Sequence, residues 1–145
     1  MTVTCNGSVL ENGKDYRLSY KNAKNIGYAT AVITGIGDYT GSRRISFAIR
    51  PKSPSIKKLK PYKSSACKIL LSKSKGGISG YEISLSENAK FQKKTTKKIS
   101  KTSCVWKKLK EGKSYYVRAR SYKKIGKKKL YSEYSKVKKL RIKKK

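Results

Sequence analysis

The chain has 145 residues, and its 39 Lys and Arg against seven Asp and Glu give a formal net charge of +32. It contains no histidine, so the usual base for nucleophilic catalysis and a common zinc ligand are both missing. No apolar run approaches the roughly 20 residues of a membrane-spanning helix. We therefore expect no enzyme activity, no cofactor, no metal site and no transmembrane segment.

The charge is distributed unevenly along the chain. Residues 1–50 carry a net +4 and residues 51–145 a net +28. This shift in composition predicts two units. Charge of this size favours polyanionic surroundings, such as nucleic acid or an anionic wall polymer. Because 32 of the basic residues are lysine, which is a point charge, the attraction would be diffuse. The alternative, which we prefer, is a solvated lysine-rich surface on a β-protein.

Residues 1–50 show the period-two alternation of strands. We expect strands at residues 2–5, 16–20, 28–34 and 44–49, joined by segments rich in Gly and Asn. Four short strands form at most a thin sandwich, whereas an Ig-like domain has about seven strands. This unit is therefore expected to be truncated at its N-terminus. The glycine-rich segment 35–41 is expected to be a strand connection, because no Gly-Lys-Ser/Thr follows it.

Residues 51–54, with two prolines, are expected to be a linker. Strands are then expected at residues 55–59, 66–72, 80–86, 91–99, 102–108, 114–123 and 130–142, a spacing typical of an all-β sandwich. In the last strand, Val137 and Leu140 are out of phase, and a bulge at Lys138 and Lys139 would return Leu140 and Ile142 to the core. The alternation predicts these inward-facing residues: Cys67, Ile69, Leu71, Tyr81, Ile83, Leu85, Cys104, Trp106, Tyr115, Val117 and Ala119.

Three segments of the second unit resemble fibronectin type III domains. Residues 109–120 (LKEGKSYYVRAR) resemble the corner and strand in which that family places a leucine and, six residues later, a tyrosine. Residues 80–85 (GYEISL) and 131–135 (YSEYS) resemble two further strands. The resemblance implies a fibronectin type III-like β-sandwich over residues 55–145. In it, Leu109 and Tyr115 would form a tyrosine corner, with a buried ring whose hydroxyl bonds to nearby backbone.

Residues 10–16 (LENGKDY), 27–30 (GYAT), 35–41 (GIGDYTG) and 46–49 (SFAI) resemble Ig-like repeats of Firmicute cell-surface proteins. The resemblance implies a partial Ig-like β repeat before the sandwich, within a larger exported protein. The chain shows no signal peptide of its own. The protein is therefore either not exported or a piece of a larger exported one. The resemblance to surface-protein repeats leads us to expect an extracellular or cell-surface location, as part of a longer protein.

The fibronectin family usually has a tryptophan where this chain has Leu71, and an aliphatic residue where it has Trp106. We expect the indole volume to have moved from one strand to its neighbour, which conserves core volume. The alternative is an exposed Trp106 in a binding patch.

The three cysteines, Cys5, Cys67 and Cys104, are interpreted as small hydrophobic residues. Cys67 and Cys104 are expected at opposite ends of two antiparallel strands. A bridge requires Cα atoms within about 7 Å, so none is expected.

The best candidate binding surface is a basic and aromatic one. Arginine lying over an aromatic ring contributes roughly 0.5–2 kcal/mol. A ladder of these side chains would stiffen the sheet, which we prefer, or form a platform for nucleic acid or glycan. The outward positions are Tyr116, Arg118, Arg120 and Tyr122, and the facing segment supplies Tyr131 and Tyr134.

The leading hypothesis is a non-catalytic cell-surface or secreted module for spacing, presentation, adhesion or ligand binding. The first alternative is a binder of polyanions, with nucleic acid less favoured than an anionic polymer or a host or cell-wall ligand. The second is an accessory module of a carbohydrate-active enzyme.

Overall fold

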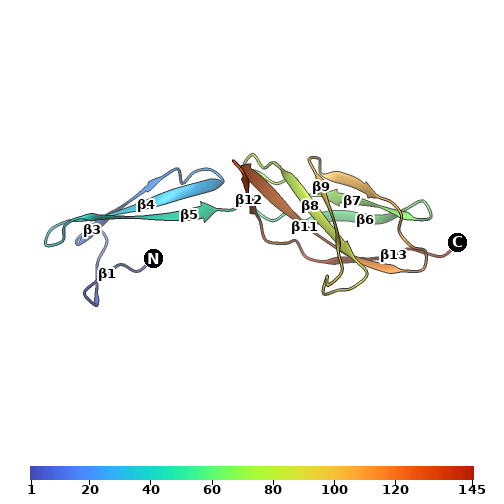
Figure 1. Cartoon of the computed structure of the whole chain (residues 1–145), viewed down its shortest axis with the longest axis horizontal. Coiled ribbons are helices and arrows are strands. Elements are labelled where there is room, and N and C mark those ends of the chain that lie inside the picture. Colours follow the sequence, from blue (N-terminus) through green and yellow to red (C-terminus); the bar gives the residue numbers. More distant parts are fainter. The chain divides into compact units, whose positions relative to one another are not determined.

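The computed structural model describes residues 1–145 and divides them into two compact units, Met1–Ile49 and Arg50–Lys145. Both are built from strands that pair antiparallel and are joined by turns (Figure 1). The predicted all-β class is confirmed. No helix capable of crossing a membrane is present.

The first unit is a hairpin followed by one three-stranded sheet. The hairpin β1 (Thr4–Cys5) and β2 (Ser8–Val9) turns at Asn6 and Gly7, whose φ angles of 48° and 82° suit a tight hairpin turn. The second strand of this hairpin was not predicted. The sheet has the order β3-β4-β5, with β3 (Tyr16–Lys21), β4 (Gly27–Gly35) and β5 (Ser42–Ile49).

One face of this sheet is mostly apolar, with Arg43 opposite Ile33. The pairing of β3, β4 and β5 places the following side chains on it: Tyr16, Leu18, Tyr20, Ala29, Ala31, Ile33, Ile45, Phe47 and Ile49. Only Tyr16, Ala29 and Ala31 are buried, whereas Tyr20 and Ile45 are 53% and 39% exposed. The first unit is therefore a single sheet with a small core rather than the thin sandwich that its strands suggested.

The second unit is a two-layer sandwich. One layer has the order β10-β7-β6, with β6 (Ile56–Tyr62), β7 (Ala66–Leu71) and β10 (Ser103–Trp106). The other has the order β12-β11-β8-β9, and β13 also pairs with β11. Its strands are β8 (Gly80–Ser86), β9 (Thr95–Ile99), β11 (Ser114–Ile125), β12 (Lys128–Tyr131) and β13 (Lys138–Arg141).

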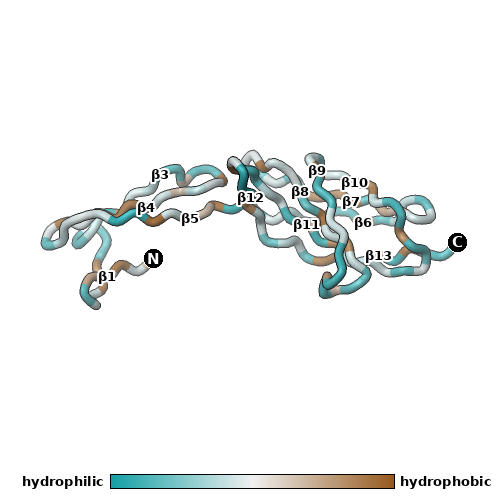
Figure 2. The backbone as a smooth tube through the Cα atoms, in the orientation of Figure 1, coloured by the Kyte–Doolittle hydropathy of each residue, from teal (hydrophilic) through white to brown (hydrophobic).

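The core lies between these two layers. Ile69, Ile83 and Val117 are at most 1% exposed, and burying such a side chain contributes about 1.5–3 kcal/mol. All predicted inward residues are buried except Cys104, which is half-buried. Figure 2 shows the resulting mixture of brown and teal along the strands of the sandwich. Period-two alternation therefore identifies this core well.

The predicted strand 130–142 is interrupted. Between β12 and β13, hydrogen bonds between two serines and β11 take the place of regular backbone pairing. The N–H of Ser132 donates to the Ser121 carbonyl, and the Ser121 N–H donates to the Ser132 hydroxyl, each at 2.9 Å. Ser135 makes the same exchange with Ala119, at 2.7 and 2.9 Å. A side-chain oxygen thus accepts the bonds that strand carbonyls would otherwise accept.

The expected bulge at Lys138 and Lys139 is wrong, because the strand is interrupted before these residues instead. Both residues pair in register with β11, and Val137 lies before the strand, 47% exposed. Leu140 and Ile142 are buried as expected, but they reach the core because β13 starts afresh after the serine segment.

Residues 51–54 do not form a free linker. They belong to the second unit, and Pro51 and Pro54 are buried. The Lys52 carbonyl accepts a 2.7 Å hydrogen bond from the Ser121 hydroxyl. Because few contacts cross a linker, these residues are better described as part of the sandwich.

The expected separation of Cys67 and Cys104 is wrong. Because β10 ends at Trp106, the short ladder pairs Trp106 with Cys67 and Cys104 with Ile69, so the two cysteines lie two residues apart in register. All three thiols of the chain are free. Burial, and secondarily the nearby Cys104, raises the pKa of Cys67 to about 11.

Trp106 and Leu71 both lie in the core, at 9% and 2% exposure. Trp106 is opposite Cys67, whereas Leu71 pairs with Ile56 near the other end of β7. The four residue steps from Cys67 to Leu71 span about 13 Å of strand. The indole is therefore a core residue, and its backbone position lies four residues along the ladder from Leu71.

Candidate functional site

The outer face of the five-stranded sheet carries the candidate site. On β11, Arg118 and Arg120 alternate with the buried Val117 and Ala119. They lie opposite Ser84 and Glu82 of β8. The short serine side chain leaves room above β8, which the long side chains of β11 occupy.

Two arginines and three aromatic rings form a stacked ladder on this face. The Arg118 guanidinium lies 4.1 Å from the ring centroid of Phe91 and 3.8 Å from that of Tyr134. The Arg120 guanidinium lies 4.7 Å from the centroid of Tyr134 and 3.7 Å from that of Tyr131. Each such contact contributes roughly 0.5–2 kcal/mol, so the stacked ladder (Phe91, Arg118, Tyr134, Arg120, Tyr131) ties the serine segment to β11.

An ion pair fixes one end of the stacked ladder. Arg120 contacts one carboxylate oxygen of Glu82 through Nε at 3.0 Å and through Nη2 at 2.8 Å. The side chains are 24% and 9% exposed, so the pair is well shielded from water. Arg118 has no such partner, and its Nε makes no hydrogen bond within the protein.

The structure brings together four of the six predicted platform residues, namely Arg118, Arg120, Tyr131 and Tyr134. Tyr122 is buried and tilted against Tyr131, with ring centroids 6.0 Å apart. Tyr116 contacts no ring of the stacked ladder and lies near Lys139, whose Nζ is 5.6 Å from the ring centroid.

The sequence places Phe91 at the start of the expected strand 91–99 and not among the platform residues, but the strand β9 begins only at Thr95. This residue precedes β9 in a turn, with φ of 52° and a 3.0 Å hydrogen bond from its N–H to the Asn88 carbonyl. It lies outside the alternation of any strand. The one available signal was a lone phenylalanine within a polar segment.

The stacked ladder presents little open ring face, and its rings at Tyr131 and Tyr134 are half-buried. Tyr134 has two guanidinium groups within 4.7 Å of its centroid, and Phe91 is 6% exposed. Stacking of a nucleobase or a sugar needs a free ring face. The geometry therefore favours the structural role of this surface over an aromatic platform.

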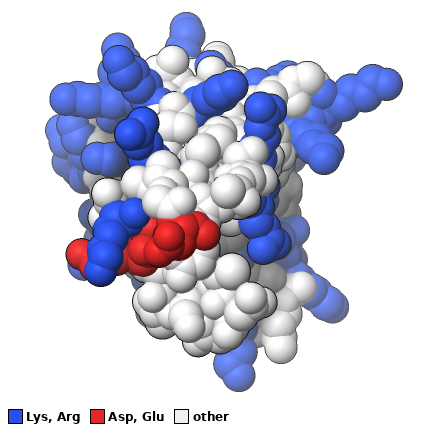
Figure 3. All heavy atoms as spheres, turned by 90° about the vertical axis from the view of Figure 1, so that its left-hand side faces the viewer, with Lys and Arg blue, Asp and Glu red and all other residues white.

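Lysines surround the stacked ladder. Lys94 lies 6.0 Å from the Tyr134 centroid, and Lys98 and Lys129 lie 5.8 and 5.7 Å from that of Tyr122. Glu82 is the only acidic residue in the five strands of this sheet. Figure 3 views the chain from the side that Figure 1 draws on the left, and it shows many blue Lys and Arg side chains and one red group of acidic side chains.

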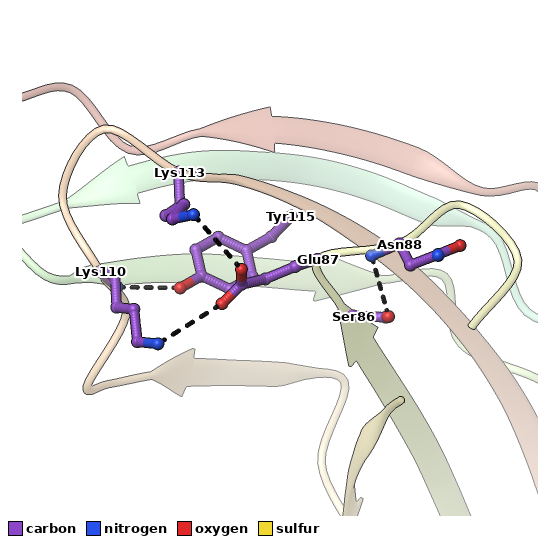
Figure 4. A network of polar contacts seen from close by, with 6 residues as sticks. All are labelled: Ser86, Glu87, Asn88, Lys110, Lys113 and Tyr115. Carbon is purple, nitrogen blue, oxygen red and sulfur yellow. Dashed lines mark hydrogen bonds and ion pairs between the residues drawn. The ribbon is translucent and has the colours of Figure 1, made fainter. Parts of the chain in front are cut away.

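The tyrosine corner lies at one end of the sandwich (Figure 4). The Tyr115 hydroxyl accepts a 2.9 Å hydrogen bond from the Lys110 N–H, and both Tyr115 and Leu109 are 5% exposed. Glu87 reaches Lys110 at 4.0 Å and Lys113 at 3.9 Å. These ion pairs are exposed and contribute about 0–1 kcal/mol each, so the corner is held mainly by the buried ring.

No group of three or more His, Cys, Asp or Glu side chains gathers to hold a metal ion. The second unit has a hollow of about 550 Å³ beside Glu87, Gln92 and Tyr115, with a single carboxylate in its lining. The outer face of the five-stranded sheet therefore carries mainly positive charge.

No family model and no curated protein matches the chain. Solved structures do match it. A structure described as that of a myokine is 15% identical, with 65% of this chain and 99% of that chain covered and a TM-score of 0.53. The fibronectin domains of chicken CNTN1 (contactin) are 15% identical over 83% of this chain and 44% of that chain, with a TM-score of 0.58.

A multidomain piece of titin is 11% identical over 99% of this chain and 54% of that chain, with a TM-score of 0.50. Identities this low show the fold alone. The chain thus has the fold of fibronectin type III and Ig-like β-sandwich domains.

Proposed function

We propose that the chain is a non-catalytic module of a larger exported surface protein, in which it spaces and presents neighbouring domains. The observation that carries the proposal is the stacked ladder. Its arginines and rings contact one another within the sheet, and this arrangement stiffens a support rather than performs chemistry.

Two further observations support this role. The contactin and titin structures that share the fold are themselves pieces with several domains. Residues 1–50 resemble repeats of Firmicute surface proteins, which is consistent with a bacterial surface array. A module within such an array needs a rigid body more than a reaction centre.

The location is tested on intact cells that produce the full-length protein. Antibodies raised against residues 50–145 should label cells whose membranes have not been permeabilised. Labelling that appears only after permeabilisation would contradict a surface role, and an antibody against a cytoplasmic protein of the same cells provides the control.

A second candidate function is binding of an anionic polymer. It is favoured by the net +28 of residues 51–145 and by the engagement of Glu82 with Arg120, which leaves the surrounding lysines without an acidic partner in the sheet. The two functions are compatible, because a spacer can also anchor itself to a charged polymer around it.

A further inference from the structure

Three lysines converge at one end of the outer sheet face. Lys98 comes from β9, Lys129 from β12 and Lys124 from β11, where Lys124 pairs directly with Lys129. The strands β9 and β12 are separated by β8 and β11. At about 4.8 Å per strand, their backbones are roughly 14 Å apart, so side-chain geometry must explain the convergence.

Gly80 provides that geometry. It lies opposite Tyr122 in the ladder, and a Cβ at this position would come within 3.0 Å of the Tyr122 hydroxyl and 2.7 Å of the Ile99 carbonyl. The Tyr122 ring therefore lies across β8. Lys98 and Lys129 both extend to it, with Nζ atoms 5.8 and 5.7 Å from its centroid.

Two positive charges therefore lie beside the same ring, and Glu82 is the one acidic residue in the strands of this sheet. The neighbouring Lys129, followed by Tyr131, raises the pKa of Lys98. The neighbouring Lys98, followed by burial and then by the charge of Lys124, lowers the pKa of Lys129. Glu82 also acts on both lysines, but Arg120 already holds it at 2.8 Å, so one carboxylate is shared among three positive groups.

The chemistry of the site restricts its ligand. Lysine is a compact point charge with rotatable donors, which suits a tetrahedral phosphate as well as any anion and does not need a planar fork. Of the rings beside the lysines, Tyr122 is buried and Tyr131 is half-buried with the Arg120 guanidinium 3.7 Å from its centroid, so little free ring face is left to stack a base. A phosphodiester chain without bases meets both conditions.

We propose that Lys98, Lys124 and Lys129 form the anchoring site for a base-free polyphosphodiester, the chemistry of anionic cell-wall polymers. A phosphate group placed between the Lys98 and Lys129 ammonium groups supplies the missing negative charge. This inference rests on the second proposed function, that of a polyanion binder, and assigns its site.

The test uses the full chain and a synthetic glycerol-phosphate oligomer, with the dissociation constant measured by calorimetry across a range of salt concentrations. The site variant is Lys98→Gln/Lys129→Gln. The matched control is Lys57→Gln/Lys60→Gln, which removes two exposed lysines from β6 in the other layer. Melting curves establish that both variants fold.

The site variant should weaken binding roughly tenfold and reduce the slope of log affinity against log salt by about 1.4, at about 0.7 per phosphate contact on a flexible strand. The control variant should keep most of the affinity and most of the salt slope of the unchanged chain. Equal losses in the two variants would overturn the site, since binding would then be spread over the surface.

Two further outcomes are separable from that one. If the unchanged chain does not bind the oligomer at physiological salt, the polyanion function itself fails. If single-stranded DNA with the same number of phosphates binds more tightly and with the same sensitivity to the site variant, the choice of a base-free polymer is wrong.

Discussion

Arg120 is the residue through which the stacked ladder can be tested most sharply. Replacing it in Arg120→Ala removes two contacts with aromatic rings and leaves the carboxylate of Glu82, a 7% exposed residue, without its partner. Breaking a buried ion pair from one side costs about 3–5 kcal/mol. Because the Arg120 side chain is itself 24% exposed, we place the whole loss, rings included, within that same range of about 3–5 kcal/mol.

The assay is urea unfolding followed by the fluorescence of Trp106, the single tryptophan, which is 9% exposed in the folded state. Glu82→Gln keeps the stacked rings and should cost less than Arg120→Ala. The double variant should cost less than the sum of the two, with a coupling of about 1–3 kcal/mol. A loss below about 1 kcal/mol for Arg120→Ala, or additive single variants, would refute the ladder as a stabilising element.

Three other changes have definite expected outcomes. Tyr115→Phe should reduce the free energy of unfolding by about 1–2 kcal/mol, because the Lys110 N–H loses its acceptor, and the same urea assay measures it. Gly80→Ala should cost about 1–3 kcal/mol and separate Lys98 from Lys129, which nuclear magnetic resonance of the lysine side chains would show; an unchanged spectrum would contradict the role of Gly80. For Cys67, the pKa of about 11 in the folded chain, against an ordinary value of 9.0, means that its stabilising contribution is complete below pH 9 and is lost as the pH rises toward 11. The stability advantage of the unchanged chain over Cys67→Ala should therefore shrink by about 1 kcal/mol between pH 8 and 10, and a constant difference would show that the thiol is not shielded.

The sequence predicts the strands of the sandwich well where apolar and polar residues alternate without interruption. The strands β7, β8 and β11 begin at the expected residues, because each carries at least three inward apolar side chains at period two. Alternation fails between β12 and β13. There, Ser132 and Ser135 bond to β11 through their hydroxyls, and no periodic signal accompanies such bonds.

The candidate site was only partly predictable for a related reason. Alternation along β11 places Arg118 and Arg120 on the outer face, and the neighbouring tyrosines follow from the resemblance. Phe91 enters from a turn, and Lys98 meets Lys129 only because Gly80 allows a ring to cross an intervening strand. Both depend on contacts between segments far apart in the sequence, about which local patterns carry no information.

The central claim is that the aromatic rings of the stacked ladder are engaged with arginine while the lysines around them remain available. It is tested most directly by nuclear magnetic resonance of the full chain saturated with the glycerol-phosphate oligomer. We predict that the side-chain signals of Lys98 and Lys129 shift while the ring protons of Tyr134, which lies 3.8 Å from the Arg118 guanidinium, stay in place. Shifts of the Tyr134 ring as large as those of the lysines would show that the ligand stacks on an open platform, and would contradict the claim.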